Sequence, residues 1–316
     1  MKLVIQIPCL NEEATLPATI RDLPREVPGF SSVEFLVIDD GSTDCTAEVA
    51  RALGIHHVLR LGSRRGLAAA FQHGLAYSME QGADVVVNTD ADNQYRALDI
   101  PALVAPILAN QADLVVGCRP ILGHPEFSFL KKILQVVGSW TLRLLSQTNV
   151  RDAASGFRAF SRETCMRIFL YSRFSHCMET LIQAGNSGMR VGSVDVQINA
   201  QTRPSRLFRS IPEYVLRSAA TILNMFLLYR PLELFLSLSI VLFASAGALA
   251  LRFIYLIYFL NTLEVGRTHL PSLILMATLI ILGGLTAALG LIGLLIRNQR
   301  RLLEESLFLL RKNKQA

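Results

Sequence analysis

Charged residues are scarce in this chain of 316 residues: they make up 18% of the sequence, against 51% for apolar residues. The shortage is uneven, because residues 1–205 have the composition of an ordinary α/β protein while two long stretches after Arg230 carry almost no charge. A basic stripe with interleaved aromatic residues is also missing from the first 200 residues. Nucleic-acid binding is therefore not expected, and the net charge of +6 is equally compatible with an anchor beside an anionic membrane.

Two glycine-rich nucleotide-binding motifs are absent. No G-x-G-x-x-G follows the first predicted strand, which disfavours an oxidoreductase that uses a dinucleotide. No G-x-x-x-x-G-K-[ST] occurs either, which disfavours a phosphotransferase of the P-loop type. Any nucleotide site must therefore be built from other loops.

Features of a secreted protein are missing too. The five cysteines have neither close pairing nor the spacing of metal ligands, so they are expected to be reduced and mostly buried: Cys9, Cys45, Cys118, Cys165 and Cys177. A strand is expected to begin at Lys2, so no signal peptide is expected. The first part of the chain is predicted to be a cytosolic domain.

Apolar runs and turn residues predict that strands alternate with helices over the first 120 residues. Strands are expected at 3–7, 34–38, 58–61, 85–88 and 113–117, helices from about 12 and at 45–53, 67–81 and 98–109, and a later strand near 191–198. Pro8 is expected to end the first strand, because proline cannot continue a central ladder, and Asn11 to cap the next helix. This alternation predicts an α/β fold with a doubly wound, mostly parallel, Rossmann-like sheet.

Polar loops follow four of the predicted strands, at residues 8–12, 39–44, 90–94 and 117–119. Open α/β sheets bind ligands beyond the carboxyl ends of their strands, so these loops are expected to line one crevice. Asp90, Asp92 and Gln94 follow the buried run 85–88 at a spacing of two, and such side chains point the same way in extended chain. Their oxygens are the ligands that Mg²⁺ and Mn²⁺ prefer. A helix cap with a solvated turn is the alternative, and the neighbouring polar loops favour the metal site.

Two uncharged stretches lie in the last third of the chain, at 234–251 and 270–296. Each is long enough to cross roughly 30 Å of hydrocarbon at about 1.5 Å per residue. They predict a two-helix transmembrane hairpin at about 232–260 and 270–296, with a very apolar buried helix as the alternative. The arginines outside the spans place both ends in the cytoplasm by the positive-inside rule: Arg230, Arg297, Arg300 and Arg301.

Two amphipathic, basic stretches precede the spans, the second of them directly. Residues 127–147 and 207–229 are predicted to be helices that lie in the membrane interface, although packing on the protein core is the alternative. The resulting domain prediction is a cytosolic catalytic domain at 1–205, an interfacial helix at 206–230, two spans within 231–297 and a basic amphipathic tail at 298–316.

Four motifs in order along the chain resemble those of family 2 glycosyltransferases with the GT-A fold: Pro8-Cys9-Leu10-Asn11-Glu12-Glu13, Asp39-Asp40-Gly41-Ser42-Thr43-Asp44, Asp90-Ala91-Asp92-Asn93-Gln94 and Ser155-Gly156-Phe157-Arg158. More narrowly, residues 2–230 resemble polyprenyl-phosphate sugar transferases of the dolichol-phosphate mannose synthase type. The Gln-x-x-Arg-Trp motif of processive polysaccharide synthases is absent, since the only tryptophan, Trp140, follows Ser139.

The resemblance implies roles for particular residues. The nucleoside-diphosphate sugar would be bordered by Pro8, Leu10, Glu12, Val37, Asp39 and Ala91, with Mg²⁺ or Mn²⁺ held by Asp90, Asp92 and Gln94. Arg119 matches an arginine that contacts the diphosphate, and Lys131 lies where such enzymes carry a basic residue for the lipid phosphate. Arg206, in Ser205-Arg206-Leu207, matches an acceptor-side element, although Arg203-Pro204 replaces its glycine-containing lead-in. Asp92, Arg119 and Lys131 are the predicted catalytic residues, and Arg158 is expected to be structural, paired with a carboxylate such as that of Asp152.

The function predicted from these features is inverting transfer of a sugar from a nucleoside-diphosphate sugar to a polyprenyl phosphate, undecaprenyl or dolichyl, at the cytosolic membrane face. One alternative is a glycosyltransferase that acts on another membrane lipid or on a growing glycan. Another is a non-catalytic membrane scaffold that retains a nucleotide-sugar fold. A homo-oligomer stays open, because a two-span hairpin often packs against copies of itself.

Overall fold

The computed structural model describes residues 1–120, 141–143, 146–170, 176–199, 219–220, 223–224, 226–258 and 270–315. The chain divides into two compact units. One comprises Met1–Ala219 together with Glu304–Ala316, and the other comprises Ala220–Leu303.

The described residues of the first unit form a seven-stranded sheet in the order β3-β2-β1-β4-β6-β5-β7. The strands are β1 (Lys2–Cys9), β2 (Ser32–Asp39), β3 (His57–Arg60), β4 (Val85–Asn88), β5 (Leu114–Cys118), β6 (Arg158–Ser161) and β7 (Val191–Asp195). All neighbouring pairs run parallel except those that involve β6, which is antiparallel to both β4 and β5. The predicted doubly wound, mostly parallel sheet is confirmed.

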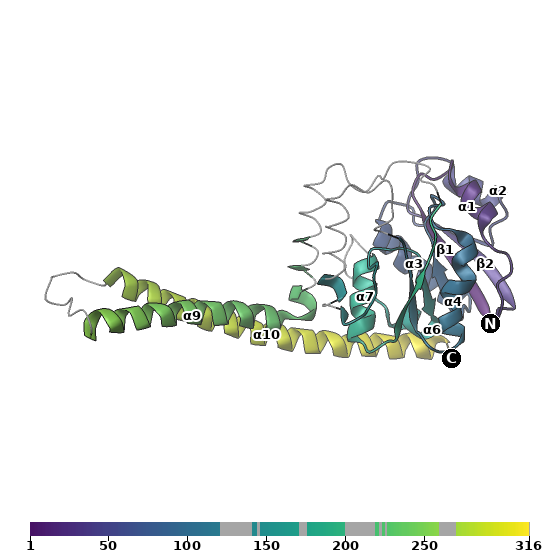
Figure 1. The fold of residues 1–316 in the computed structure, drawn as a ribbon. Helices are drawn as coiled ribbons and strands as arrows, with labels where there is room; N and C mark the ends of the chain where they lie inside the picture. Colours follow the sequence, from purple (N-terminus) through teal and green to yellow (C-terminus); the bar gives the residue numbers. More distant parts are fainter. Residues whose placement is uncertain are drawn as a thin grey trace. The chain divides into compact units, whose positions relative to one another are not determined.

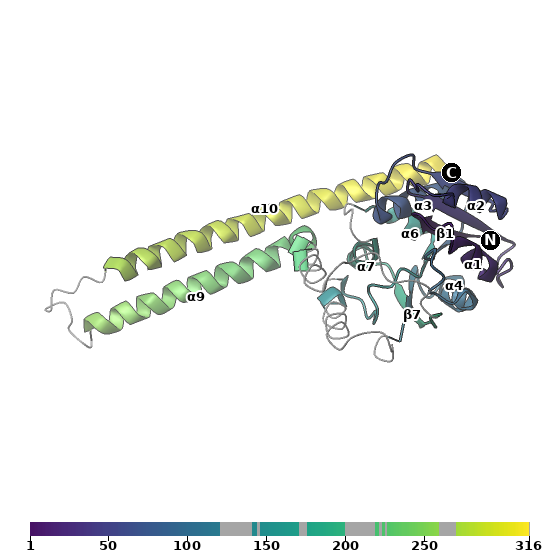
Figure 2. The same cartoon turned by 90° about the horizontal axis from the view of Figure 1, so that it is seen from above.

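Helices cover both faces of this sheet (Figures 1 and 2). On one face lie α1 (Leu16–Asp22), α2 (Thr46–Ala52), the 3₁₀ turn η1 (Ala97–Asp99) and α4 (Ile100–Leu108), and on the other α3 (Leu67–Glu80), α6 (Arg162–Arg167) and α7 (His176–Asn186). Each face has its own apolar core, and the valines of β4 are fully buried because both faces are covered. Burial of one such side chain contributes about 1.5–3 kcal/mol, so the two cores hold the sheet between its helical layers.

The structure corrects two predictions at the end of the first strand. β1 continues through Pro8, because its pairing with β4 stops at Gln6 while its pairing with β2 runs on to Cys9. The carbonyl of Gln6 accepts from the Thr89 amide, so Pro8 presents its missing N–H to the side where β4 has already ended. Asn11 does not cap α1, which begins at Leu16 after Thr15. The Asn11 backbone has a positive φ of 56°, and its side chain binds the next loop instead.

The strand β6 was not predicted. Its four residues, Arg158–Ser161, are too few to show a period, and they follow the Ser155-Gly156 turn directly. In the structure β6 inserts between β4 and β5 and runs against both. The insertion brings the turn that precedes β6 beside the carboxyl end of β4, where Asp90 lies.

The second unit contains α9 (Pro231–Tyr258) and most of α10 (Leu270–Gln315). Within it, the two helices pack closely where α10 has glycine: an added Cβ would lie 2.9 Å from Phe243 at Gly283 and 2.6 Å from Pro231 at Gly293. Both helices are long and apolar enough to cross a membrane, and only 11% of the most apolar window of each is buried. Such exposure suits lipid-facing helices better than core helices of a soluble protein.

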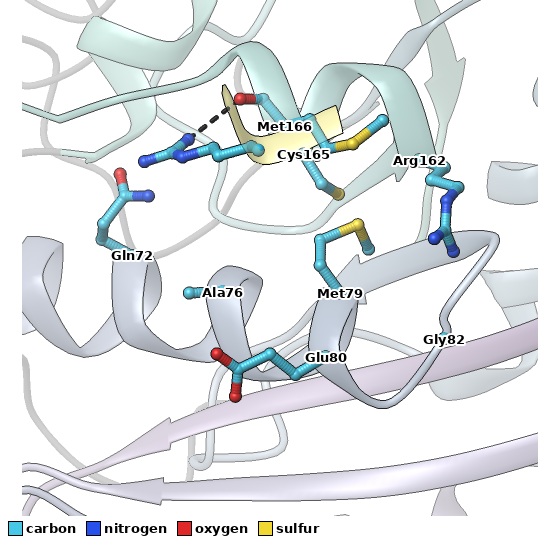
Figure 3. Close-up of a pocket in the computed structure, with 9 residues that line it drawn as sticks. Gln72, Ala76, Met79, Glu80, Gly82, Arg162, Cys165 and Met166 are labelled. Carbon is cyan, nitrogen blue, oxygen red and sulfur yellow. Dashed lines mark hydrogen bonds between the residues drawn. The ribbon is translucent and has the colours of Figure 1, made fainter. Parts of the chain in front are cut away.

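The end of α10 belongs to the first unit rather than to the hairpin. Phe308 is 6% exposed and packs in the core formed by α3 and α6, with the Arg167 guanidinium 3.8 Å from its ring centroid. Arg167 also pairs with Glu305 at 3.0 Å, and Nη1 of Arg311 donates to the Met166 carbonyl at 2.9 Å. A pocket of about 490 Å³ lies between α3, α6 and Arg311 (Figure 3). It contains no predicted site residue.

Replacement of Phe308 tests this docking. We expect Phe308→Ala to lower the free energy of unfolding of the catalytic unit by about 3–5 kcal/mol, because it empties a packed aromatic site. Leu309→Ala is the matched control: Leu309 is 50% exposed on the same helix, so a change within about 0.5 kcal/mol is expected. Denaturant unfolding in detergent gives both values, and equal effects of the two variants would contradict the docking.

Candidate active site

Three neighbouring parallel strands, β2, β1 and β4, deliver their polar loops to one edge of the sheet. Cys9 at the end of β1 is in register with Asp39 at the end of β2, and Asp90 follows β4 on the other side of β1. Burial raises the pKa of the Cys9 thiol well above its usual value, and the surrounding carboxylates raise it further, among them Glu12, Asp39 and Asp90. The predicted convergence of these loops is therefore present, and the carboxylates make the edge acidic.

Hydrogen bonds join the loops after β1 and β2. The Asn11 amide donates to Ser42 Oγ at 3.0 Å, and the Asn11 side-chain oxygen accepts from the Thr43 amide at 2.8 Å. The Glu12 amide donates to Thr46 Oγ1 at 2.8 Å, and its carboxylate accepts from Thr15 Oγ1 at 2.6 Å. Hydrogen bonds therefore hold the two loops together.

Asp39 has one carboxylate oxygen without a hydrogen bond. Its side chain is fully buried, and Oδ1 accepts from the Ser42 amide at 2.8 Å. Oδ2 lies 3.2 Å from Nε of Arg60 but receives no hydrogen bond from the described residues. A buried acceptor of this kind is costly unless a partner arrives, so Oδ2 suits an N–H or O–H donor of a ligand.

Asp40, the next residue, organises the basic loop 62–66. Its two carboxylate oxygens accept from the backbone amides of Arg65 at 2.7 Å and Gly66 at 2.8 Å. Gly41 allows this close approach, since a Cβ there would lie 2.7 Å from the Arg64 backbone nitrogen. The loop is thus held against the end of β2.

The loop 90–94 is held from two sides. The Ala91 carbonyl accepts from Thr19 Oγ1 at 2.8 Å, and the Asn93 side chain donates to Asp22 at 2.7 Å, both on α1. On the other side, the Asn199 amide donates to the Gln94 carbonyl at 2.8 Å. Oδ1 of Asp92 accepts from the Gln94 amide at 3.2 Å, which turns the chain sharply after Asp92.

The Asp90 carboxylate lies against Gly156. A Cβ on Gly156 would be 3.3 Å from Oδ1 and 3.4 Å from Oδ2 of Asp90, so a side chain there would push the carboxylate by a few tenths of an ångström. The Gly156 carbonyl accepts from Nδ2 of Asn88 at 2.9 Å, and Oδ1 of Asn88 in turn accepts from Gln6 at 3.0 Å. A buried chain of amide side chains therefore ties the turn to the two central strands.

Arg119, after β5, forms a buried ion pair with Asp152. Nε and Nη2 donate to the two carboxylate oxygens at 2.6 and 3.1 Å, and the Asp152 side chain is fully buried. Burial lowers the pKa of Arg119, but nearby Tyr95 and Asp152 outweigh it, so the net pKa is raised and the guanidinium stays charged. The expected pairing of Asp152 with Arg158 is wrong, because Arg158 donates instead to Thr180 Oγ1 and to carbonyls.

With this geometry in view, comparison with known proteins identifies the family. The family model of glycosyl transferase family 2 matches residues 4–169, more than half of the chain. The chain belongs to glycosyl transferase family 2. The undecaprenyl-phosphate mannosyltransferase of Micrococcus luteus is 31% identical over 54% of this chain and 70% of the relative. The polyprenol monophosphomannose synthase of Mycolicibacterium smegmatis is 28% identical over 61% of this chain and 76% of the relative.

A solved structure has the same fold. The glucosyl-3-phosphoglycerate synthase of Mycobacterium tuberculosis, in complex with Mn²⁺, uridine diphosphate and glucosyl-3-phosphoglycerate, superimposes with a TM-score of 0.55. The match covers 72% of this chain and 78% of that chain at 23% identity, so it supports the GT-A fold alone. The resemblance to family 2, the GT-A fold and the enzyme class predicted from the sequence are confirmed, and the chain is a glycosyltransferase.

The donor set at the end of β4 fits a divalent cation in this glycosyltransferase. Asp90 and Asp92 are half-buried, so each residue keeps part of its surface exposed at the carboxyl end of β4. No group of three His, Cys, Asp or Glu side chains that would enclose a metal occurs in the described part of the chain. Two carboxylates with an amide nearby suit a cation such as Mg²⁺, which usually keeps waters and takes the rest of its ligands from substrate phosphates.

The other predicted site residues differ in how deeply they are buried. Pro8 is buried in β1, Leu10 is half-buried beyond it, and Glu12 is 7% exposed in the same loop. Val37 is fully buried in the core with α1 and α2, so its side chain supports β2 and does not reach the crevice surface. Lys131 and Arg206 lie outside the described residues, and their roles stay predictions.

Sequence reasoning missed three groups that build the site: Tyr95, the Asn88–Gly156 contact, and residues 196–199, which run beside the loop 90–94. The Tyr95 hydroxyl is buried among Arg119, Asp90 and Asp152, and burial raises its pKa to about 12. Tyr95 is therefore neutral at physiological pH. Its position directly after Gln94 is the one signal in the sequence that could have pointed to it.

Proposed function

We propose that this glycosyltransferase moves a sugar from a nucleoside-diphosphate sugar to a polyprenyl phosphate, with inversion at the sugar carbon. The observation that carries the proposal is the position of Asp90 and Asp92 at the exit of β4, two strands from Asp39, whose Oδ2 receives no hydrogen bond from the described residues. This arrangement offers one group for a nucleotide base and another for a diphosphate along a single edge of the sheet.

On the donor side, Oδ2 of Asp39 would accept a hydrogen bond from the base, while the joined loops around Glu12 would border the ribose. Asp90 and Asp92 would hold Mg²⁺ or Mn²⁺ together with Gln94. The bound cation would neutralise the negative charge of the leaving diphosphate. Arg119, oriented by Asp152, would add a second positive charge on the same diphosphate. Two relatives named above are an undecaprenyl-phosphate mannosyltransferase and a polyprenol monophosphomannose synthase, which supports a polyprenyl-phosphate acceptor.

On the acceptor side, an oxygen of the lipid phosphate would attack the anomeric carbon as the bond from that carbon to the diphosphate breaks. The phosphate is already anionic near neutral pH, so positioning and charge neutralisation matter more than a strong base. The products are the sugar-phosphate lipid and the nucleoside diphosphate. Lys131 and Arg206 are proposed to contact the lipid phosphate.

A membrane anchor suits such an enzyme, because its polyprenyl phosphate acceptor does not leave the bilayer. Both candidate spans are flanked by arginines outside the apolar stretch, at Arg230 and at Arg297, Arg300 and Arg301. We propose on this basis that both termini and the catalytic domain are cytoplasmic. The domain boundaries predicted above are part of the same proposal.

A two-stage assay tests the function. The full chain in detergent is first screened for a thermal shift with GDP-, UDP- and dTDP-sugars in the presence of Mn²⁺. The sugar nucleotide that stabilises the protein is then supplied in labelled form with undecaprenyl phosphate, diacylglycerol or no lipid. We expect label in the undecaprenyl phosphate alone. Transfer to diacylglycerol instead would favour the other lipid class, and no stabilisation by any sugar nucleotide would favour a scaffold.

A further inference from the structure

The turn 153–157 lies between the two groups that the proposed function assigns to the diphosphate. Gly156 contacts the Asp90 carboxylate, and Asp152, directly before the turn, binds the Arg119 guanidinium with both oxygens. A displacement of this turn would move both groups at once. The residues that hold the turn in place therefore affect the position of both groups. These residues are Arg158 and Tyr95, and neither is among the predicted ligands.

Arg158 holds the turn from the side of α7. Its Nε donates to the Ser155 carbonyl and its Nη2 to the Ala153 carbonyl, each at 2.8 Å. Nη1 donates to the Cys177 carbonyl and to Thr180 Oγ1, each at 2.7 Å. One planar guanidinium thus connects two carbonyls of the turn to the first turns of α7, a span that a lysine ammonium cannot cover.

Tyr95 holds the turn from the side of the loop 90–94. Its hydroxyl accepts from the Gly156 amide at 3.0 Å, and its ring stacks on Phe157 with 5.0 Å between centroids. Because Tyr95 follows Gln94 directly, this contact ties the turn to the loop that carries Asp90 and Asp92. The Gly156 carbonyl is fixed at the same time by Asn88.

The electrostatics of Arg158 indicate more than a packing role. The residue is fully buried, and no ion pair among the described residues includes it. In the described part of the chain its hydrogen-bond partners are carbonyl and hydroxyl oxygens, and taking a charge out of water is costly in stability. A buried cation is thus a costly way to support a turn, but its planar fork of N–H donors gives the turn a fixed geometry.

We propose that Arg158 and Tyr95 are positioning residues that fix the turn 153–157, and through it Asp90 and Arg119, in the geometry that binds a metal–diphosphate group. The inference rests on the proposed function of the site. Neither residue touches the reacting atoms; each acts through the backbone of the turn.

The test measures metal–diphosphate binding rather than activity. Electron paramagnetic resonance of Mn²⁺, titrated into the full chain in detergent with inorganic pyrophosphate, reports the affinity, and thermal unfolding reports the fold. We expect Arg158→Lys to weaken binding about tenfold and Tyr95→Phe about fivefold, the latter because it removes one hydrogen-bond partner and keeps the ring. Arg190→Lys is the matched control: Arg190 binds Asp113 and Asn110 at the start of β5, away from the site.

Each result is decisive. Arg190→Lys should lower the unfolding temperature without weakening Mn²⁺–pyrophosphate binding. Wild-type affinity in both Arg158→Lys and Tyr95→Phe would overturn the inference, as would an equal loss in Arg190→Lys, which would make the effect one of stability. If Arg158→Lys does not fold, Tyr95→Phe decides alone. Failure of the wild-type chain to bind Mn²⁺ with pyrophosphate would instead count against the proposed function itself.

Discussion

Asp92→Asn is expected to reduce sugar transfer by about 10²–10³-fold while the protein stays folded. The substitution removes one negative charge from the pair that we propose holds the cation. It keeps a side-chain oxygen, so the hydrogen bond from the Gln94 amide to Oδ1 can still form and the turn after Asp92 can persist. Asp92 is half-buried at the crevice, so its loss leaves no cavity in the core.

Asp113→Asn is the control for this variant. Asp113 is a carboxylate at the opposite end of the sheet, where hydrogen bonds from Arg190 lower its pKa. We expect it to affect stability slightly and transfer not at all. Transfer rates with the preferred sugar nucleotide, together with unfolding temperatures, separate the two cases. Wild-type rates in Asp92→Asn, or undiminished transfer by the wild-type chain in excess chelator, would contradict the metal site.

Arg119→Met is expected to abolish transfer and also to destabilise the catalytic unit by about 3–5 kcal/mol. The stability loss arises because the fully buried Asp152 carboxylate would lose its partner. The loss of transfer has a separate cause, since a positive charge beside the leaving diphosphate would be gone. A single variant therefore mixes two effects.

The double variant Arg119→Met with Asp152→Asn separates them. Removal of the unpaired charge should recover most of the stability, because an amide is far less costly to bury than a carboxylate. Transfer should remain abolished, since no guanidinium returns to the crevice. Unfolding free energies and transfer rates of the wild type, both single variants and the double variant complete the cycle. Recovery of transfer in the double variant would show that Arg119 acts only through the fold.

Several features of the site could be predicted because their signals are local. The run of valines before Asp90, the acidic turn after β2 and the uncharged stretches near the end of the chain are each visible within about 20 residues. Parallel topology then follows from alternation, and it brings the exit loops of β1, β2 and β4 to one edge. No knowledge of side-chain contacts is needed for these steps.

Other features depend on contacts between residues far apart in the chain. The pairing of Asp152 with Arg158 predicted from the sequence is wrong, because Arg158 lies at the start of β6 with its side chain directed to α7. The partner of Asp152 is Arg119, 33 positions away. Phe308 and Arg311 likewise pack on α6, and Arg311 binds a carbonyl 145 positions away.

The sequence by itself determined the α/β class, the acidic strand exit and the two apolar helices, because periodicity and strand–helix alternation are properties of short segments. Only the tertiary structure decided that β6 enters between β4 and β5, that Gly156 lies against Asp90 and that Asp152 orients Arg119. These contacts depend on how whole helices and strands pack. The order of the strands in the sheet decides which residues become neighbours, and the local sequence does not reveal that order.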